Sequence, residues 1–443
     1  MATTDPVGDL TAFPILPPAG AVPTHGSPEF ALGPAAPPQE PAAALPRAAD
    51  AIAEQGRGGE GRAGAPGGLP PRPANTRYQS LDLWRGAACV MLLLYHATFY
   101  GDYQFRLSDR STWTWAGVPL HVIRHCWFGV PIFFVISGYC IAGSIDSLRR
   151  KPHSLRDYFV RRFRRIYPPL WIMCGLAVLF TWAMAQLPAV REHCHQLPDL
   201  AGMSAWQWLG NFVAAESWRH QLGGGEPAYL MANTWTLCYE EQFYFVTGLL
   251  LAFSGRRFFQ MAAWLTLAVL VLRHAGPAMG IPREGFFWDG HWLMFAAGLL
   301  IYHALNYASW RKTLITHACL AAGMGYAVAA RWSASNFADK HLAEYLFVAS
   351  AFGILLIGLR RWDRPISQHA WLAPLRWCGQ RSYSIYLTHY LVVVVVSSWL
   401  ALGGLRSEWH VATVVVPACT LVSLPVAVLF YELVERRFLN QPA

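Results

Sequence analysis

Two residues that could bind an anion and move a proton share one face of an apolar run. Arg85 and His96 lie eleven residues apart within residues 81–101, which are otherwise mostly apolar. At about 100° per residue, eleven steps make three turns plus roughly 20°, and the two side chains stand about 16 Å apart along the helix axis. A buried imidazole can act as a general base near neutral pH. The alternative is a snorkelling arginine and a hydrogen-bonded histidine with no chemical role.

A second polar group opens the apolar run 234–253. Glu240, Glu241 and Gln242 follow one another there, between Trp235 and Tyr244. Adjacent helical residues point about 100° apart, so one acid can face a polar cavity while the other reaches the membrane interface. The alternative is an interfacial pair of acids inside an aromatic belt. That alternative suits Glu241 better than Glu240.

A third group begins the apolar run 382–402. Ser382, Ile385 and His389 follow the i, i+3, i+7 spacing and form one stripe of a helix. Ser384 and Thr388 are typical of hydroxyls that bond back to their own helix carbonyls. A second histidine buried in a span indicates proton handling or ligand contact.

A basic segment precedes the apolar run 166–187. Arg161, Arg162, Arg164 and Arg165 occupy four of five consecutive positions. A topology anchor is one role for them. Four arginines so close cover most of a helix circumference, however, so some must point into the bundle. Because guanidinium groups suit phosphates, the segment predicts a phosphorylated cytoplasmic ligand.

These segments belong to a chain with the composition of a membrane protein. Of its 443 residues, 54% are hydrophobic and 14% charged, against about 25% charged in soluble proteins. A span needs about 20 mostly apolar residues. The sequence therefore predicts an all-α bundle of about ten transmembrane helices. They are expected near 81–101, 122–145, 166–187, 234–253, 258–274, 287–305, 313–330, 342–359, 382–402 and 410–432.

The distribution of charge predicts the topology and two parts of the chain. Residues 149–165 carry eight cations and one acid, and the predicted inner loops hold most other arginines. This asymmetry follows the positive-inside rule and predicts that both termini lie in the cytoplasm. The expected location is the bacterial inner membrane. It also explains the net charge of +9 without a nucleic-acid partner. Residues 1–76 hold 15 of the 30 prolines and are expected to be a disordered tail before a membrane domain at 77–438.

Metal chemistry is not expected. The nine cysteines include no CxxC pair, and the cluster His193-Cys194-His195 consists of adjacent residues. Adjacent ligands rarely close a tetrahedral site.

In these segments the chain resembles the acyltransferase-3 family of integral-membrane O-acyltransferases, over roughly residues 77–438. The resemblance rests on five short motifs that occur in order, each at an expected span. Their matching residues are Arg85 and His96; Phe133, Phe134, Ser137, Gly138 and Tyr139; Arg161, Arg162, Arg165, Ile166 and Pro168; Trp235, Leu237, Glu240, Phe243 and Tyr244; and Ser382, Tyr383, Tyr386, Leu387 and His389.

The resemblance implies an acyl-CoA donor, most often acetyl-CoA, and a hydroxyl acceptor on a glycan or lipid-linked sugar. Arg161, Arg162 and Arg165 are then expected to bind the donor phosphates, with Arg85 deeper. His96 is the expected base or transient acyl carrier, and Glu240 would fix its tautomer.

The remaining positions are expected to place the substrates. His389 and Tyr383 would orient the acceptor or polarise the thioester carbonyl. Ser137, Trp235 and Tyr244 are expected to position substrate. The chain departs from the family pattern in two ways. Cys238 and Tyr239 differ from the residues that are usual at these positions. The C-terminal hydrolase-like domain of many members is not expected here.

A transporter is the main alternative class. A proton-coupled transporter or a lipid-linked sugar flippase could use the same intramembrane histidine and glutamate for proton coupling. Gly129, Pro131 and Gly138 could break helices as such folds require, but the sequence shows no inverted repeat.

Overall fold

The computed structural model describes residues 78–99, 115, 117–151, 154–187, 197–280, 289–334, 337–405 and 407–439. All of them belong to one compact unit. The predicted tail 1–76 and the cluster His193-Cys194-His195 lie outside these ranges.

The described part of the chain is helical and contains no strand. Ten helices fall in the ten predicted spans: α1 (Leu81–Phe99), α3 (Gly129–Leu148), α4 (Ser154–Ala185), α8 (Trp235–Ser254), α9 (Phe258–Ala275), α10 (His291–Tyr307), α11 (Trp310–Ser333), α12 (Phe337–Gly358), α15 (Ser382–Leu402) and α17 (Val416–Phe430). Shorter helices connect them: α2 (Gly117–Arg124), α6 (Ala205–Phe212), α7 (Glu216–Gly223), α13 (Asp363–Gln368), α14 (Ala373–Gln380), α16 (Glu408–His410) and α18 (Arg436–Phe438).

Seven helical stretches of the described residues are long and apolar enough to cross a membrane. One of them, Ala232–Ala275, contains both α8 and α9. Helices α1 and α10 are not among the seven, and α10 has only 17 residues. The predicted multi-pass, all-α membrane fold is therefore confirmed, while the count of ten spans stays a prediction.

Hydrogen bonds between helix ends support an alternating up-and-down path. At one side, Tyr302 near the end of α10 donates to Asp146 near the end of α3 at 3.0 Å. At the other side, Arg273 near the end of α9 donates to Asp339 near the start of α12 at 2.7 Å. Each pair joins helix ends that the sequence places on the same side of the membrane.

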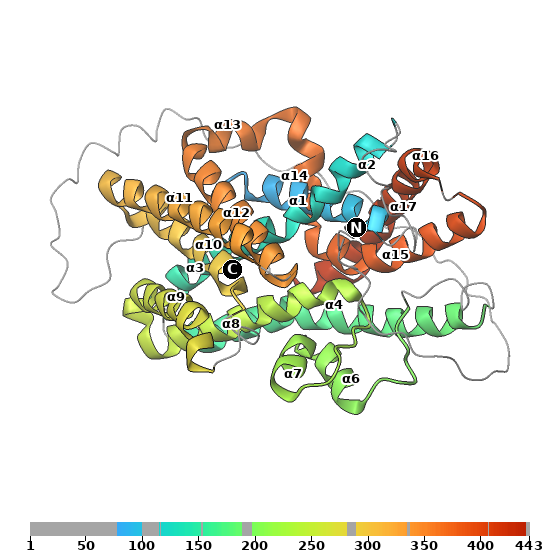
Figure 1. Cartoon of the computed structure of the whole chain (residues 1–443), viewed down its shortest axis with the longest axis horizontal. Coiled ribbons are helices and arrows are strands. Elements are labelled where there is room, and N and C mark those ends of the chain that lie inside the picture. Colours follow the sequence, from blue (N-terminus) through green and yellow to red (C-terminus); the bar gives the residue numbers. More distant parts are fainter. Residues whose placement is uncertain are drawn as a thin grey trace, which may run out of the picture. The chain divides into compact units, whose positions relative to one another are not determined.

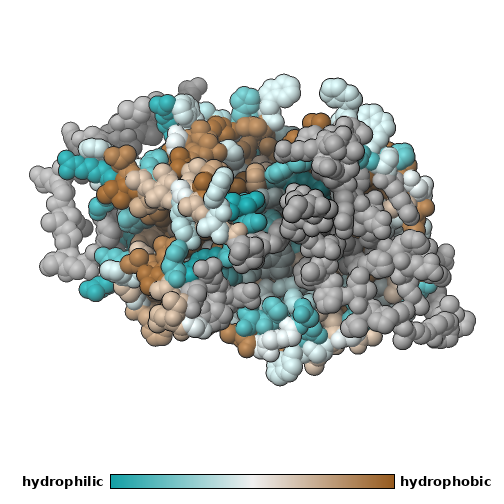
Figure 2. Space-filling model, in the orientation of Figure 1, coloured by the Kyte–Doolittle hydropathy of each residue, from teal (hydrophilic) through white to brown (hydrophobic). Residues whose placement is uncertain are grey.

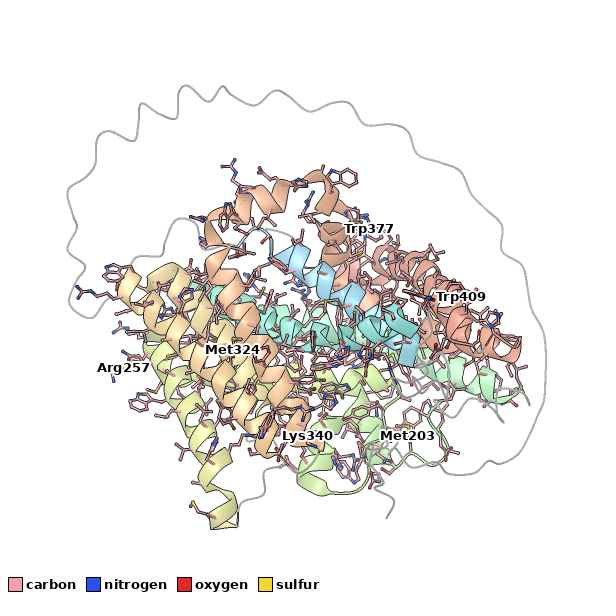
Figure 3. The ribbon with its side chains drawn as sticks, turned by 45° about the horizontal axis from the view of Figure 1, so that its top comes forward. Met203, Arg257, Met324, Lys340, Trp377 and Trp409 are labelled. Atoms are coloured by element: carbon pink, nitrogen blue, oxygen red, sulfur yellow. The ribbon has the colours of Figure 1, made fainter. Side chains whose placement is uncertain are left out.

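The figures show that helix ends from the two sides lie apart, and they show the character of the outer surface. Figure 3 shows Arg257, between α8 and α9, at the left edge of the ribbon and well apart from Met203 and Lys340. On the face drawn in Figure 2, hydrophobic surface forms broad patches. Exposed apolar side chains such as Leu179 on α4 and Leu421 on α17 suit contact with lipid.

Two glycines allow α3 and α10 to pack backbone to backbone. A Cβ atom on Gly138 would lie 2.1 Å from the carbonyl oxygen of Phe295, and one on Gly298 would lie 2.2 Å from that of Val135. Small residues permit such close approach in membrane bundles. The contact fixes Ser137, the neighbour of Gly138, relative to α10.

Helix α4 begins twelve residues before the predicted span 166–187, so the basic segment is the first part of this helix and not a loop. Tyr158 explains the extension, because it is buried and its hydroxyl bonds to Thr247 on α8 at 2.8 Å. Pro168 and Pro169 lie inside α4 and cannot donate to the carbonyls four residues earlier. Helix α6 packs beside α4, and α7 beside α8 (Figure 1).

Candidate active site

A cavity lined by both charged and apolar side chains lies among α1, α3, α4, α8 and α15 and has a volume of about 110 Å³. A single water needs only about 10–15 Å³, so the cavity has room for a ligand group. Its lining contains Arg85, Arg162 and Arg165, with Glu240 as the acid. Three cations against one carboxylate favour an anionic ligand in a place where isolated charges are costly.

The arginines are held by neighbouring side chains. Arg85 donates to Asp82 at 2.8 Å and to the sulfur of Cys140 at 3.3 Å. The guanidinium carbon of Arg162 lies 4.6 Å from the ring centroid of Tyr244, a cation–π distance. These contacts aim both guanidinium groups at the cavity from different helices, α1 and α4.

Glu240 joins α8 to α3. One of its carboxylate oxygens accepts hydrogen bonds from the hydroxyls of Ser137 and Tyr244. Glu241 points elsewhere, as adjacent helical residues must, and accepts from Tyr167 at 3.1 Å. The geometry therefore does not support the expectation that Glu240 fixes the tautomer of His96, because Glu240 bonds to the hydroxyls of Ser137 and Tyr244.

His96 pairs instead with His389. Its Nδ1 lies 2.8 Å from Nε2 of His389, and Nδ1 of His389 lies 2.8 Å from the carbonyl oxygen of Ile385. A carbonyl oxygen only accepts, so Nδ1 of His389 carries the proton and its Nε2 accepts from Nδ1–H of His96. This chain of bonds leaves Nε2 as the basic nitrogen of His96. Sequence spacing could not show it, since the two histidines are 293 residues apart.

The histidine pair lies beyond the end of the cavity that faces away from Arg85. Leu92 and Tyr386 line the cavity, four and three residues before His96 and His389. One helical turn rises about 5.4 Å, so the pair lies roughly one turn past that lining. The arrangement is an arginine-rich chamber that leads toward a fixed imidazole pair.

The structure brings most of the predicted site residues to the cavity lining and leaves four outside it: the pair His96 and His389 beyond its end, and Arg161 and Trp235 elsewhere. The predicted residues that line it are Arg85, Ser137, Arg162, Arg165, Glu240, Tyr244 and Tyr383. Arg161 is exposed on another face of α4, and Trp235 packs against the rings of Tyr239 and His291, each at 5.9 Å. The Tyr383 hydroxyl donates to the carbonyl of Ile166 at 2.8 Å, so it ties α15 to α4.

Comparison with known proteins identifies the family. A family model described as an acyltransferase domain, Acyl_transf_3, matches residues 78–432. The chain belongs to the acyltransferase-3 family. No solved structure matches it.

Several curated relatives share this family membership. The chain is 26% identical over 379 residues to "Putative peptidoglycan O-acetyltransferase YrhL" of Bacillus subtilis (strain 168), which covers 79% of this chain and 57% of the relative. It is 24% identical over 358 residues to peptidoglycan O-acetyltransferase OatA of Listeria monocytogenes, covering 73% and 51%. It is 24% identical over 308 residues to O-acetyltransferase OatA of Staphylococcus aureus, covering 66% and 50%. The chain thus spans about half the length of the curated relatives it matches.

Three polar residues near the histidine pair had no role in the sequence prediction. Tyr386 and Thr236 line the cavity, and their hydroxyls lie 3.1 Å apart. The Tyr386 hydroxyl also donates to the carbonyl of Asn233 at 2.8 Å. Tyr386 was visible as a motif residue of this acyltransferase-3 member. Asn233 and Thr236 gave no signal, because small polar residues at the start of a helix are typical of caps.

Within the described ranges, no three His, Cys, Asp or Glu side chains are arranged to hold a metal ion. The prediction that the chemistry needs no metal stays a prediction.

Proposed function

We propose that this chain is a membrane O-acyltransferase that moves an acetyl group from cytoplasmic acetyl-CoA to a hydroxyl of an envelope glycan such as peptidoglycan. The proposal places it in the bacterial inner membrane with both termini in the cytoplasm. Family membership supports the reaction class, and the names of the curated relatives support an O-acetyl product on peptidoglycan.

The observation that carries the proposal is one cavity with cations along it and an imidazole pair beyond its far end. Arg85, Arg162 and Arg165 suit the phosphates of an acyl-CoA, which are anionic and need several donors. The histidine pair suits proton transfer at the acceptor hydroxyl. Donor and acceptor would then meet between the two ends.

In the proposed reaction, Nε2 of His96 takes the proton of the acceptor hydroxyl while the hydroxyl oxygen attacks the thioester carbonyl carbon. The carbon–sulfur bond then breaks, and the departing thiolate receives the proton from the imidazolium. The products are an O-acyl ester and the free CoA thiol. Nε2 of His389 holds Nδ1–H of His96 and stabilises the imidazolium, the role that a carboxylate has in a Ser-His-Asp triad.

Replacing the base tests this function. With purified protein, radiolabelled acetyl-CoA and a glycan fragment, we expect His96→Ala to lower transfer by about 10²–10⁴-fold, the usual contribution of general base catalysis. His125→Ala is the control, because His125 is exposed and its ring bonds only locally, to the carbonyl of His121 one turn earlier. His125→Ala should keep the melting temperature of the wild type, and His96→Ala, which loses the bond to His389, should remain folded at the assay temperature.

Two outcomes would contradict parts of the proposal. Near-normal turnover of His96→Ala would remove His96 as the base. Glycan uptake without thioester cleavage would favour a transporter. Mass spectrometry of envelope glycans from cells with and without the gene tests the acceptor, since loss of the gene should remove O-acetyl groups from one glycan.

A further inference from the structure

The two ends of the cavity can be told apart from the contacts between α1 and α3. At one end Arg85 of α1 donates to the sulfur of Cys140 of α3 at 3.3 Å. At the other end a Cβ atom on Gly129, where α3 begins, would lie 2.7 Å from the side chain of Leu92 of α1. The two helices therefore run in opposite directions along the cavity. Leu92 lies about 10 Å beyond Arg85 along α1, toward the histidine pair.

The end near Leu92 is mostly apolar. Five side chains from α1, α3 and α8 form this apolar end of the cavity: Leu92, Val130, Phe133, Phe134 and Leu237. The hydroxyls of Thr236 and Tyr386 line the cavity nearby, and both are already bonded to the backbone carbonyl of Asn233, at 3.1 and 2.8 Å. Such a wall suits a hydrocarbon group and does not suit a phosphate.

Charged groups are held at the opposite end. Arg162 lies over the ring of Tyr244, whose hydroxyl donates to Glu240. Glu240 also accepts from Ser137, which is one helical turn from Phe133 along α3. The lining therefore changes from charged to apolar within about one turn of α3.

Phe133 and Phe134 are the two large rings of the apolar end, and they are held differently. Phe134 is 3% exposed and packs on Phe295 with ring centroids 4.5 Å apart, so it belongs to the wall between α3 and α10. Phe133 is only partly buried, and its ring lines the cavity. It packs against a buried cluster that includes Ile385, one turn before His389. Phe133 thus lies between the arginines and the histidine pair, where the acyl group would react.

We propose that the apolar end binds the acyl chain of the donor and that Phe133 sets the longest chain that the enzyme transfers. This inference rests on the proposed function. Phosphates bound by the arginines fix the direction of the donor, so its thioester points toward the histidine pair. The hydrocarbon of the acyl group then meets Leu92, Val130 and Phe133. A short acyl group fits there, whereas a longer chain must displace the ring of Phe133.

The chemistry of an apolar pocket gives the size of the effect. One methylene group too many costs about 10–200-fold in kcat/KM. Phe133→Ala removes the ring, so chains that the wild type rejects gain room. We expect this variant to raise the ratio of kcat/KM for hexanoyl-CoA to that for acetyl-CoA by about 10-fold or more. Phe133→Leu removes less volume and should shift the ratio in the same direction by a smaller factor.

The test uses the purified full-length protein with one glycan fragment as acceptor. The donors are acetyl-CoA, propionyl-CoA, butyryl-CoA and hexanoyl-CoA. For the wild type, kcat/KM should fall about 10-fold or more when one methylene is added to the longest accepted chain. Ratios between donors, measured on one sample, do not depend on how much of a variant is folded. Phe133→Leu keeps more of the core volume and serves if the alanine variant does not fold.

Phe258→Ala is the matched control. Phe258 is also a buried phenylalanine, with 0% of its surface exposed, but it lies on α9, which contributes no side chain to the cavity lining. Its removal leaves a void of similar size elsewhere in the bundle. The variant should therefore keep the wild-type ratios between donors.

The outcomes separate this inference from the proposed function. If the wild type transfers no acyl group from any donor, the proposed function fails. If the wild type is active and Phe133→Ala keeps its ratios, only the inference fails. Equal loss with every donor would assign Phe133 a purely structural role and also overturn the inference. A wild type that transfers hexanoyl and acetyl groups equally well would overturn it too, because the apolar end would then not limit chain length.

Discussion

The packing of α3 against α10 gives a prediction whose size follows from the structure. In Gly138→Ala, the new Cβ would lie 2.1 Å from the backbone oxygen of Phe295. An ordinary contact begins near 3.4 Å, so the two helices must separate by roughly 1.3 Å at this point. Backbone atoms cannot rotate aside as a flexible side chain can. The strain of such overpacking is typically about 1–3 kcal/mol.

The displacement acts directly on the candidate site. Ser137 precedes Gly138 and donates to Glu240, so the shift pulls that hydroxyl away from the carboxylate. A misplacement of about 1 Å can cost about 100-fold in rate. We therefore expect Gly138→Ala to lower kcat by roughly 10- to 100-fold and to lower the melting temperature. Gly298→Ala should do the same, because its Cβ would lie 2.2 Å from the carbonyl oxygen of Val135 on the facing helix α3.

The assay is acetyl transfer at saturating acetyl-CoA, together with thermal unfolding of the purified protein. Gly175→Ala on α4 is the matched control, since a Cβ there meets nothing within 4 Å. It should leave both quantities unchanged. If Gly138→Ala keeps kcat within about twofold of the wild type, the close approach of α3 and α10 does not position the site.

Two further predictions concern charged residues. Arg165→Ala should raise KM for acetyl-CoA by about 10-fold or more with a smaller change in kcat, because Arg165 lines the cavity and a charged hydrogen bond is lost. Arg164 is exposed, so Arg164→Ala should change neither constant. Equal effects of the two variants on steady-state kinetics would refute this assignment. Asp146→Ala should destabilise the fold by about 3–5 kcal/mol, because the fully buried carboxylate binds the buried guanidinium of Arg149 at 2.6 Å. A free energy of unfolding equal to that of the wild type would contradict this prediction.

The sequence predicted which segments form helices better than it predicted which helices and side chains contact one another. Each expected span contains a helix, because long apolar runs have few other solutions in a membrane. Arg85, Arg162 and Glu240 line one cavity, as ionisable residues in spans should. Periodicity gives the face on which a residue lies, but it does not say which helix packs there. The pairing of His96 with His389 in place of Glu240 depended on that missing information.

Two other differences have similar causes. Arg161 matched a family motif as well as Arg162 did, yet one step of about 100° turns it out of the cavity. The start of α4 was placed too late because the prediction followed hydropathy, and the arginine-rich turns are polar. Their helical state depends on Tyr158, whose partner Thr247 lies on α8, and no local signal shows that contact.

The two prolines of α4 bear on how the arginines of the cavity could move. Pro168 and Pro169 omit two consecutive rungs of the hydrogen-bond ladder just after the arginines, and the Tyr383 hydroxyl braces the adjoining turn from α15. Bending is cheapest where a ladder is interrupted. A bend of α4 at this point would therefore change the position of Arg162 and Arg165 relative to the part of the helix that follows the prolines, at little cost in hydrogen bonds.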